Sequence, residues 1–370
     1  MRNILGKIWK FVKKVSLPDA IFVTAILIII TIPNIMLNKK QYELVEKRPL
    51  AKMPKLIVNG KINKELGKQF ENFYNDNFWQ RNTCIDKNLA IKGFINGRME
   101  GYLEIEGQNG CLFYKGDDSV SNYKNKVLFS DMELLRIKHN LDILNVWCNK
   151  NGIKLIVVIP PDKNRVYGEY FPKHIKKVNP KSRVELLREF LDENSNIKII
   201  YPIEQMYERK KMDEEPLYYH TDTHWTQTGS YIAYNEIFKQ IAREHPYLQN
   251  VDCNKLRTER KNYSGDCTIN PKKKKSDFTY LFYDEPVLKY TIKKYDLKIA
   301  IIGDSFSGEL SRWLGKSFDI SYNQYNKTVE LFNKFSMEMW EDRILAYNPD
   351  VLVVEIVERY ADKLLDLYKE

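Results

Sequence analysis

The residue best placed for chemistry is Ser305, which follows an apolar run and precedes a helical pattern. Residues 299–302 read Ile-Ala-Ile-Ile, a run typical of a buried strand, and the amphipathic spacing from Phe306 to about Leu314 predicts a helix. Ser305 is therefore expected at the carboxyl edge of a sheet, where open α/β folds bind ligands. The free N–H groups at the start of the helix would stabilise a developing oxyanion. We predict a nucleophile; the alternative is a plain turn in which the serine caps the helix.

A serine nucleophile needs a base and a group that orients the base. The histidines of the chain are His139, His174, His220, His224 and His245. His224 lies on a predicted loop, just before a helix that Thr226 is expected to cap. Asp222 lies two residues earlier on the same loop, within reach of the imidazole Nδ1. We predict that His224 accepts the proton of Ser305 through Nε2 while Asp222 holds the ring.

The same loop has two other interpretations. His220, Asp222 and His224 alternate, and a catalytic zinc requires three protein ligands and an open position. Alternate residues point the same way only if the segment is strand-like. A structural histidine pair is the second alternative. The proton-relay interpretation is favoured because a metal site would leave Ser305 unused, so neither a metal nor a cofactor is predicted.

Length and charge limit the class of protein. The chain has 370 residues, which allows one large domain or two ordinary ones, and its hydrophobic residues amount to 43%, enough for a packed core. The formal net charge is +10, with a run of lysines at 272–275. That run is a solvated loop or gives a general affinity for anionic surfaces. No nucleic-acid-binding motif accompanies the charge, so no nucleic-acid partner is predicted.

The amino end predicts a membrane anchor. Residues 20–37 are almost continuously apolar and follow five basic residues within the first fourteen positions. This length just spans a bilayer core of about 30 Å, and the basic flank would keep the amino end in the cytoplasm. A cleaved signal peptide is the alternative, disfavoured because no small-x-small site follows. The predicted organisation is a cytoplasmic tail (1–19), a transmembrane anchor (20–38), a linker (39–60) and, outside the cell membrane, the domain that carries Ser305 (61–370).

Beyond the anchor, apolar runs alternate with amphipathic stretches. Strands are predicted at 153–159, 197–201, 299–302, 318–322 and 351–357, and helices at 131–151, 183–191, 226–243, 306–314 and 329–347. This alternation predicts an α/β fold with a mostly parallel sheet covered by helices on both faces. The basic segment from 244 to about 289 is predicted to be irregular. Of the five cysteines, Cys253 and Cys267 are close enough in sequence to pair in an oxidising compartment.

Two motifs resemble known families. Gly-Asp-Ser-Phe at 303–306 resembles the serine block of the SGNH hydrolases, and Asp-Thr-His-Trp-Thr at 222–226 resembles the Asp-His-His-Trp-Thr signature of the DHHW and AlgX/AlgJ-like proteins. Further similar segments occur in the order of that family at 70–81, 159–163, 264–266 and 358–359. The resemblance covers the chain from about residue 46 onward. One departure is Thr223, which replaces the first histidine of the signature.

The resemblance implies a fold and an activity. These families are SGNH-hydrolase-like O-acetyltransferases of exported polysaccharides, with a flavodoxin-like fold and permuted motif order. Ser305 would carry the acetyl group, and Gly265 or Asn323 would join the Ser305 N–H in holding the oxyanion. The implied partners are an exported or cell-wall polysaccharide acceptor and a membrane-bound O-acyltransferase that supplies acetyl groups, since acetyl-CoA is not exported. The alternatives are an acetylesterase with the same residues and a non-catalytic cell-surface assembly protein.

The positions and types of four further residues suggest a role in substrate binding. Lys163 and Arg359 each follow a predicted strand at the same sheet edge, where they would orient an anionic or polyhydroxyl acceptor. Plain surface charge is the alternative for both. Tyr219 and Trp225 would stack on sugar rings, and core packing is the alternative for both of these.

Overall fold

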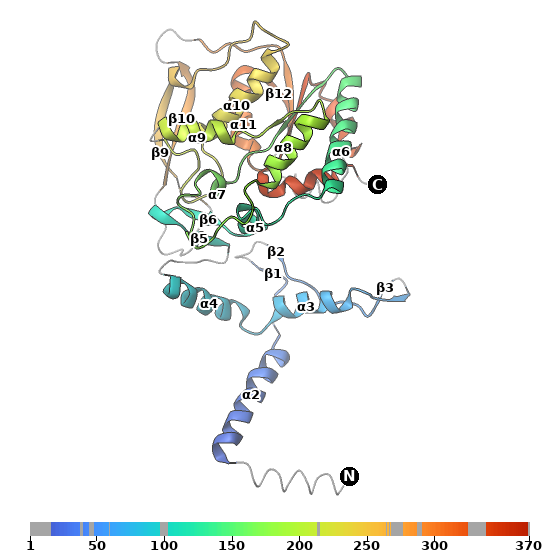
Figure 1. Ribbon diagram of the computed structural model, residues 1–370, viewed down its shortest axis with the longest axis vertical. Helices are drawn as coiled ribbons and strands as arrows, with labels where there is room; N and C mark the ends of the chain where they lie inside the picture. The colour runs from blue at the N-terminus through green and yellow to red at the C-terminus, as the bar shows by residue number, and fades with distance from the viewer. Residues whose placement is uncertain are drawn as a thin grey trace. The chain divides into compact units, whose positions relative to one another are not determined.

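The computed structural model describes the following residues: 16–37, 40–43, 48–58, 60–96, 103–212, 215–263, 265, 267, 277–286, 291–324 and 338–368. The chain divides into two compact units, Met1–Tyr102 and Leu103–Glu370 (Figure 1). The main domain was predicted to start at residue 61, whereas the boundary between the compact units lies at 102/103.

The first unit contains helices and two small hairpins. Its elements are α2 (Leu17–Ile35), β1 (Tyr42–Glu43), β2 (Arg48–Pro49), β3 (Ile57–Val58), β4 (Lys61–Ile62), α3 (Leu66–Asn77) and α4 (Arg81–Asn96). The guanidinium of Arg48 donates to both carboxylate oxygens of Asp76, at 2.8 and 2.6 Å. This hydrogen bonding lowers the pKa of Asp76 and ties β2 to the end of α3. Over the stretches that the structure describes, no helix has both the length and the apolar character needed to cross a membrane.

The second unit is built on a five-stranded parallel sheet. Its strands are β7 (Lys154–Val158), β8 (Ile199–Ile200), β11 (Lys298–Ile302), β12 (Asp319–Gln324) and β13 (Val351–Glu355), in the order β12-β11-β13-β7-β8. Each strand falls within or beside a predicted one, and every residue of β13 is buried. The chain runs from β7 to β8 at one edge of the sheet and later from β11 to β12 at the other edge. The direction of strand addition therefore reverses at the centre of the sheet, near β7, β13 and β11. Ligands bind at such a reversal in open α/β folds.

Helices pack on both faces of this sheet (Figure 1). The long ones are α6 (Asp131–Lys150), α8 (Arg183–Asn194), α10 (Gln227–Ala242) and α11 (Ser307–Ser317). Ser130 and Ser182 begin α6 and α8 with capping boxes, and the hydroxyl of Thr226 accepts the Gly229 N–H to cap α10 as predicted. Helix α6 lies on one side of the sheet, and α10 and α11 lie together on the other (Figure 1).

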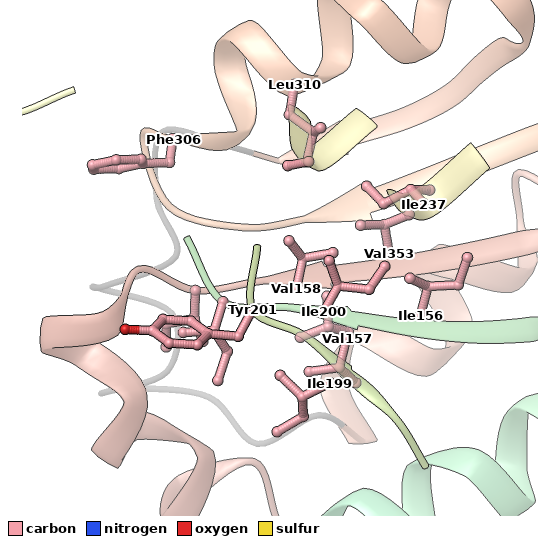
Figure 2. Packing of buried hydrophobic residues seen from close by; sticks show 14 of the residues in the cluster. Ile156, Val157, Val158, Ile199, Ile200, Tyr201, Ile237, Phe306, Leu310 and Val353 are labelled. Atoms are coloured by element: carbon pink, nitrogen blue, oxygen red, sulfur yellow. The ribbon is translucent and has the colours of Figure 1, made fainter. Parts of the chain in front are cut away.

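Apolar side chains fill the space between helices and sheet (Figure 2). Leu310 of α11 and Ile237 of α10 lie on the same side of the strands, near Val353 of β13. All three side chains are fully buried. The helix that follows Ser305 is therefore fixed by packing on α10 and on the sheet.

The segment predicted to be irregular forms a hairpin instead. Strands β9 (Leu256–Tyr263) and β10 (Asp277–Pro286) pair antiparallel. The prediction was wrong because β9 is almost entirely exposed and carries charged side chains, so it lacks the alternation of apolar and polar residues that marks a half-buried strand. A second small hairpin joins β5 (Glu104–Glu106) to β6 (Leu112–Tyr114). Within the predicted helix 329–347, α13 (Glu338–Leu345) is described, and residues 329–337 lie outside the described residues.

The cysteines form no disulfide. Cys253 and Cys267, expected to pair, are both buried thiols. Burial raises the pKa of the Cys253 thiol to about 11, which disfavours the reactive thiolate. The predicted pairing was wrong, because nearness in sequence does not bring two side chains together.

Candidate active site

The structure brings Ser305, His224 and Asp222 together at the carboxyl edge of the sheet. The Nε2 of His224 lies 2.7 Å from the Oγ of Ser305, and its Nδ1 lies 2.6 Å from Oδ1 of Asp222. Both contacts are hydrogen bonds, and together they form the chain of partners that activates a serine nucleophile. The residues come from two loops, one before α10 and one between β11 and α11.

The side chain of Asp304 fixes the turn that carries Ser305. Asp304 is buried, and its carboxylate accepts the N–H groups of Phe306 at 2.9 Å and of Val357 at 2.8 Å. A Cβ at Gly303 would lie 2.5 Å from a carboxylate oxygen of Glu355 and 2.9 Å from the Cβ of Ser307, so a larger residue would force these neighbours to shift. In the turn 303–306 only Ser305 is exposed. The sequence therefore presents one hydroxyl to solvent on an otherwise buried turn.

The loop that carries His224 is fixed to the same turn. Tyr218 and Trp225 form a short antiparallel bridge, which folds the segment between them into a tight loop. The indole N–H of Trp225 donates to the carbonyl of Phe306 at 3.0 Å, and the rings of His224 and Phe306 lie 5.0 Å apart. With Thr226 capping α10, this arrangement sets the distance between imidazole and serine through packed side chains.

Asp222 is held as a carboxylate by its neighbours. Burial alone would raise its pKa, but hydrogen bonds from His224 and from Tyr263 outweigh burial and hold the pKa of Asp222 well below its usual range. Its Oδ1 accepts both Nδ1–H and the backbone N–H of His224, and its Oδ2 accepts the hydroxyl of Tyr263 at 2.6 Å. A permanent negative charge therefore faces Nδ1 and favours the tautomer in which Nε2 is free to accept a proton.

Tyr263 is the site residue that sequence reasoning missed. It is the last residue of β9, the strand that the sequence pattern did not predict. Its ring stacks on that of Tyr219, with 4.0 Å between the ring centroids. Nothing in the local sequence relates this tyrosine to Asp222, 41 residues earlier. Its position depends on the pairing of β9 with β10.

Replacing Tyr263 with phenylalanine tests this contact. Because a hydrogen bond to a charged group contributes about 1.5–3 kcal/mol, the free energy of unfolding should fall by about that amount at pH 7. The hydroxyl of Tyr263 lowers the folded-state pKa of Asp222. Its contribution to the free energy of unfolding is therefore complete above about pH 5 and decreases as the pH falls below the carboxyl's ordinary pKa of about 4. Denaturant titrations at several pH values measure this. Tyr283→Phe, which removes a surface hydrogen bond in the same hairpin, is the control; equal losses in both variants would contradict the assignment.

Lys163 does not face a substrate. Its ammonium group is buried and donates to three carbonyls, those of Leu112 at 2.5 Å, His220 at 2.9 Å and Asp222 at 3.0 Å. An ammonium has three donors, so its hydrogen-bonding capacity is used. The predicted role in acceptor binding was wrong, as was the alternative of surface charge: Lys163 holds the loop that carries Asp222.

Arg359 forms a buried ion pair. Its guanidinium donates to Asp162 at 2.7 Å, and its central carbon lies 5.4 Å from the ring centre of Phe306. Arg359 is only 9% exposed, so it is not plain surface charge. Its position beside the Ser305 turn agrees with the predicted location at the sheet edge, but Asp162 balances its charge.

Tyr219 and Trp225 pack in the protein interior. Trp225 is fully buried, and Tyr219 is buried against Tyr263. Burial raises the pKa of Tyr219 to about 12. Neither ring is exposed for stacking on a sugar, so core packing, the alternative in the sequence analysis, describes both.

The structure gives different results for the two predicted oxyanion donors, Gly265 and Asn323. The N–H of Gly265 donates to the hydroxyl of Thr221 at 3.1 Å and is therefore committed to the loop, which makes that prediction wrong. Asn323 lies on β12 opposite Ile301, and its side chain lies outside what the structure describes. No acceptor among the described residues takes the N–H of Ser305, so this donor remains for an oxyanion.

Two of the three side chains in the metal interpretation, those of Asp222 and His224, are bonded to protein groups. The carbonyl of His220 accepts from Leu112 and Lys163, and burial lowers the pKa of the His220 imidazole. Both oxygens of Asp222 accept hydrogen bonds from protein groups. Across the described part of the chain, no group of three or more histidine, cysteine, aspartate or glutamate side chains is arranged to hold a metal ion.

The fold and site define a class of protein. The family described as SGNH hydrolase-like domain, acetyltransferase AlgX, matches residues 105–316, more than half of the chain, and the chain belongs to this family. The family resemblance predicted from the sequence is confirmed, as is the α/β fold with a parallel sheet.

Individual relatives are similar over shorter stretches. The probable alginate O-acetylase AlgJ of Pseudomonas fluorescens is 34% identical over 97 residues, 26% of this chain and 24% of that protein. AlgJ of Pseudomonas aeruginosa is 26% identical over 144 residues, 36% of each chain. The matches thus span only about a quarter to a third of these relatives. Among solved structures, the O-acetyltransferase domain of Pseudomonas putida AlgJ shares 20% identity with a TM-score of 0.45, over 72% of this chain and 93% of that one.

Proposed function

We propose that this protein transfers acetyl groups to hydroxyls of an exported or cell-wall polysaccharide through an acetyl-serine intermediate on Ser305. The observation that carries the proposal is the hydrogen-bonded relay from Asp222 through His224 to an exposed serine at the start of α11. Membership of the acetyltransferase family supports the type of reaction. The polysaccharide acceptor is supported by relatives that are named as probable alginate O-acetylases.

The first half-reaction acetylates the serine. His224 Nε2 accepts the proton of Ser305 Oγ while Oγ attacks the carbonyl carbon of an acetyl donor. The Ser305 N–H and the amino end of α11 stabilise the oxyanion. As the bond to the leaving group breaks, the imidazolium returns the proton to that group. Asp222 stays ionised throughout and stabilises the imidazolium.

The second half-reaction delivers the acetyl group. A sugar hydroxyl loses its proton to His224 and attacks the acetyl carbonyl, and the tetrahedral intermediate then collapses to release Ser305, which regains its proton from the imidazolium. Water in place of the sugar would make the same site an acetylesterase. Which acceptor reacts depends on how well the bound glycan excludes water.

The sequence and the family resemblance support a location and an acetyl donor. The apolar run at residues 20–37 after a basic flank supports a membrane anchor with the catalytic unit outside the cytoplasm. Acetyl-CoA is absent there, so the donor is delivered by a membrane-bound O-acyltransferase. Fractionation of cells that produce the full chain tests the location: release of the protein with the soluble fraction would contradict it.

Trapping the intermediate tests the proposed reaction. On incubation with p-nitrophenyl acetate and rapid acid quenching, peptide mass spectrometry should find one acetyl group on Ser305. The variant His224→Ala should not form this adduct at a comparable rate. Acetylation spread over lysines, with no adduct on Ser305, would overturn the proposal.

A further inference from the structure

A cavity of about 400 Å³ lies on the same sheet edge as Ser305. It is bounded by the loop after β6, by the connection from α5 (Ser119–Tyr123) to α6, and by the start of η3 (Glu358–Asp366). Helix η3 follows β13, which runs parallel to β11, so the cavity and the serine turn share the carboxyl ends of neighbouring strands. Its volume falls in the range of small-molecule sites.

Arg359 connects this cavity to the relay. It lines the cavity, its guanidinium lies 5.4 Å from the ring of Phe306, and that ring lies 5.0 Å from the ring of His224. A second, much smaller cavity is lined by the same Arg359 and by Thr223, the residue before His224. Arg359 and Phe306 therefore lie between the larger cavity and the relay.

Three buried polar atoms on lining residues have no hydrogen-bond partner among the described residues. They are Oδ1 of Asn122, Nε of Arg183 and Nε of Arg359. Each of these residues is at least nine-tenths buried. These residues line the cavity through their other atoms, so they place amide and guanidinium groups on its wall. Guanidinium groups donate, and an amide both donates and accepts, so this wall suits a ligand group that does both, as a sugar hydroxyl does.

The charges of the lining indicate a neutral ligand. Four acidic side chains (Asp117, Asp118, Glu133 and Asp362) face three basic ones (Arg183, Arg359 and Lys363). The two arginines are already paired, Arg359 with Asp162 and Arg183 with Asp362. A polyuronate would meet uncompensated carboxylates, whereas a neutral saccharide would find hydrogen-bond acceptors and two aromatic rings, Phe129 and Tyr360.

The rim of the cavity is also conformationally unusual. Asp117 and Asp118 are consecutive non-glycine residues with φ of 48° and 54°. Such residues are disfavoured, and they cluster where a loop shape serves binding. The hydroxyls of Tyr114 and Tyr360 both donate to Asp117 and hold this shape.

We propose that this cavity binds a neutral, hydroxyl-rich saccharide, which is the acceptor of the acetyl group on Ser305. The inference rests on the proposed function for the reaction, but its binding site and its preference for a neutral over a uronic-acid glycan stand on the lining alone. Asn122, Arg183 and Arg359 contact sugar hydroxyls, and the carboxylates of Asp117 and Asp118 accept from others.

Calorimetric titration of full-length Ser305→Ala protein tests the preference without turnover. The ligands are hexasaccharides of glucose, N-acetylglucosamine and mannose, and a uronate hexasaccharide. At least one neutral glycan should bind, and at least tenfold more tightly than the uronate. Val127→Trp, added to this protein, puts bulk into the cavity and should weaken that binding at least tenfold. Val146→Trp, a matched substitution at an exposed position of α6, should not. Tighter binding of the uronate, no binding by any neutral glycan, or equal binding in both tryptophan variants would overturn the proposal.

Hydrolysis of p-nitrophenyl acetate by the wild-type protein separates this inference from the proposed function. This small ester reports on the serine chemistry and does not need an acceptor site. If the ester is hydrolysed but the titrations fail, the acceptor site is wrong and the reaction stands. If Ser305 is never acetylated but the neutral glycan binds as expected, the cavity is a saccharide site and the proposed reaction fails.

Discussion

Replacing Ser305 with alanine is expected to lower the rate of acetyl transfer by about 10⁵-fold or more. Loss of the nucleophile in a serine relay costs about 10⁶-fold in a well-studied protease. The hydroxyl is the only exposed group of its turn, and its hydrogen bond to Nε2 of His224 places it next to the base. Without this hydroxyl, a sugar hydroxyl or water would have to attack the acetyl donor directly. Transfer from p-nitrophenyl acetate to a glycan acceptor measures the loss.

The fold should survive this change, because the Oγ of Ser305 contacts only His224 and is exposed. Ser311→Ala provides a matched control on the same helix: its hydroxyl donates to the carbonyl of Gly308, away from the relay. This variant should retain transfer within about twofold of wild type. Similar rates for both variants, or substantial transfer by Ser305→Ala, would show that the serine is not the acetyl carrier.

The parts of the site that local sequence encodes were predictable. Ser305 was found because a run of buried strand residues ends in Gly-Asp-Ser and a helical pattern begins at once. Asp222 and His224 were found because few histidines exist and Thr226 marks the start of a helix. These loops meet although they lie 81 residues apart in sequence: the Ser305 loop follows β11, and the His224 loop, between α9 (Ile203–Met212) and α10, is held to it by the hydrogen bond from Trp225 to Phe306.

The side chains that support the relay were not predictable, because their roles depend on distant backbone. A lysine after a strand predicts a cation at the sheet edge, yet Lys163 is buried under three carbonyls that belong to two other segments. Gly265 was assigned to the oxyanion, yet its N–H meets the hydroxyl of Thr221. Tyr263 was overlooked because its strand is exposed and charged. In each case the hydrogen-bond partner lies in a distant part of the chain, so the local sequence pattern could not predict the contact.

Replacing Asp222 with asparagine is expected to lower transfer by about 10⁴-fold while leaving the loop folded, in line with the cost of the equivalent change in a serine protease. The carboxylate accepts three hydrogen bonds, two at Oδ1 from His224 and one at Oδ2 from Tyr263. Asparagine has one acceptor oxygen, so its amide N–H₂ must face one of these donors. More importantly, the neutral amide leaves the imidazolium of His224 without the negative charge that stabilises it during proton transfer.

A loss that is confined to the chemical step distinguishes this role from a structural one. In Asp222→Asn, kcat should fall while the KM for the glycan changes by less than about threefold, because Asp222 contacts His224 and Tyr263 and does not line the cavity. Asp131→Asn, an exposed carboxylate in the first turn of α6, is the control for loss of one negative charge and should match wild type. Combining Asp222→Asn with Tyr263→Phe should cost less than the two separate losses added as free energies, since the tyrosine acts on His224 only through the carboxylate. If the losses add in full, Tyr263 acts on the reaction by a different route.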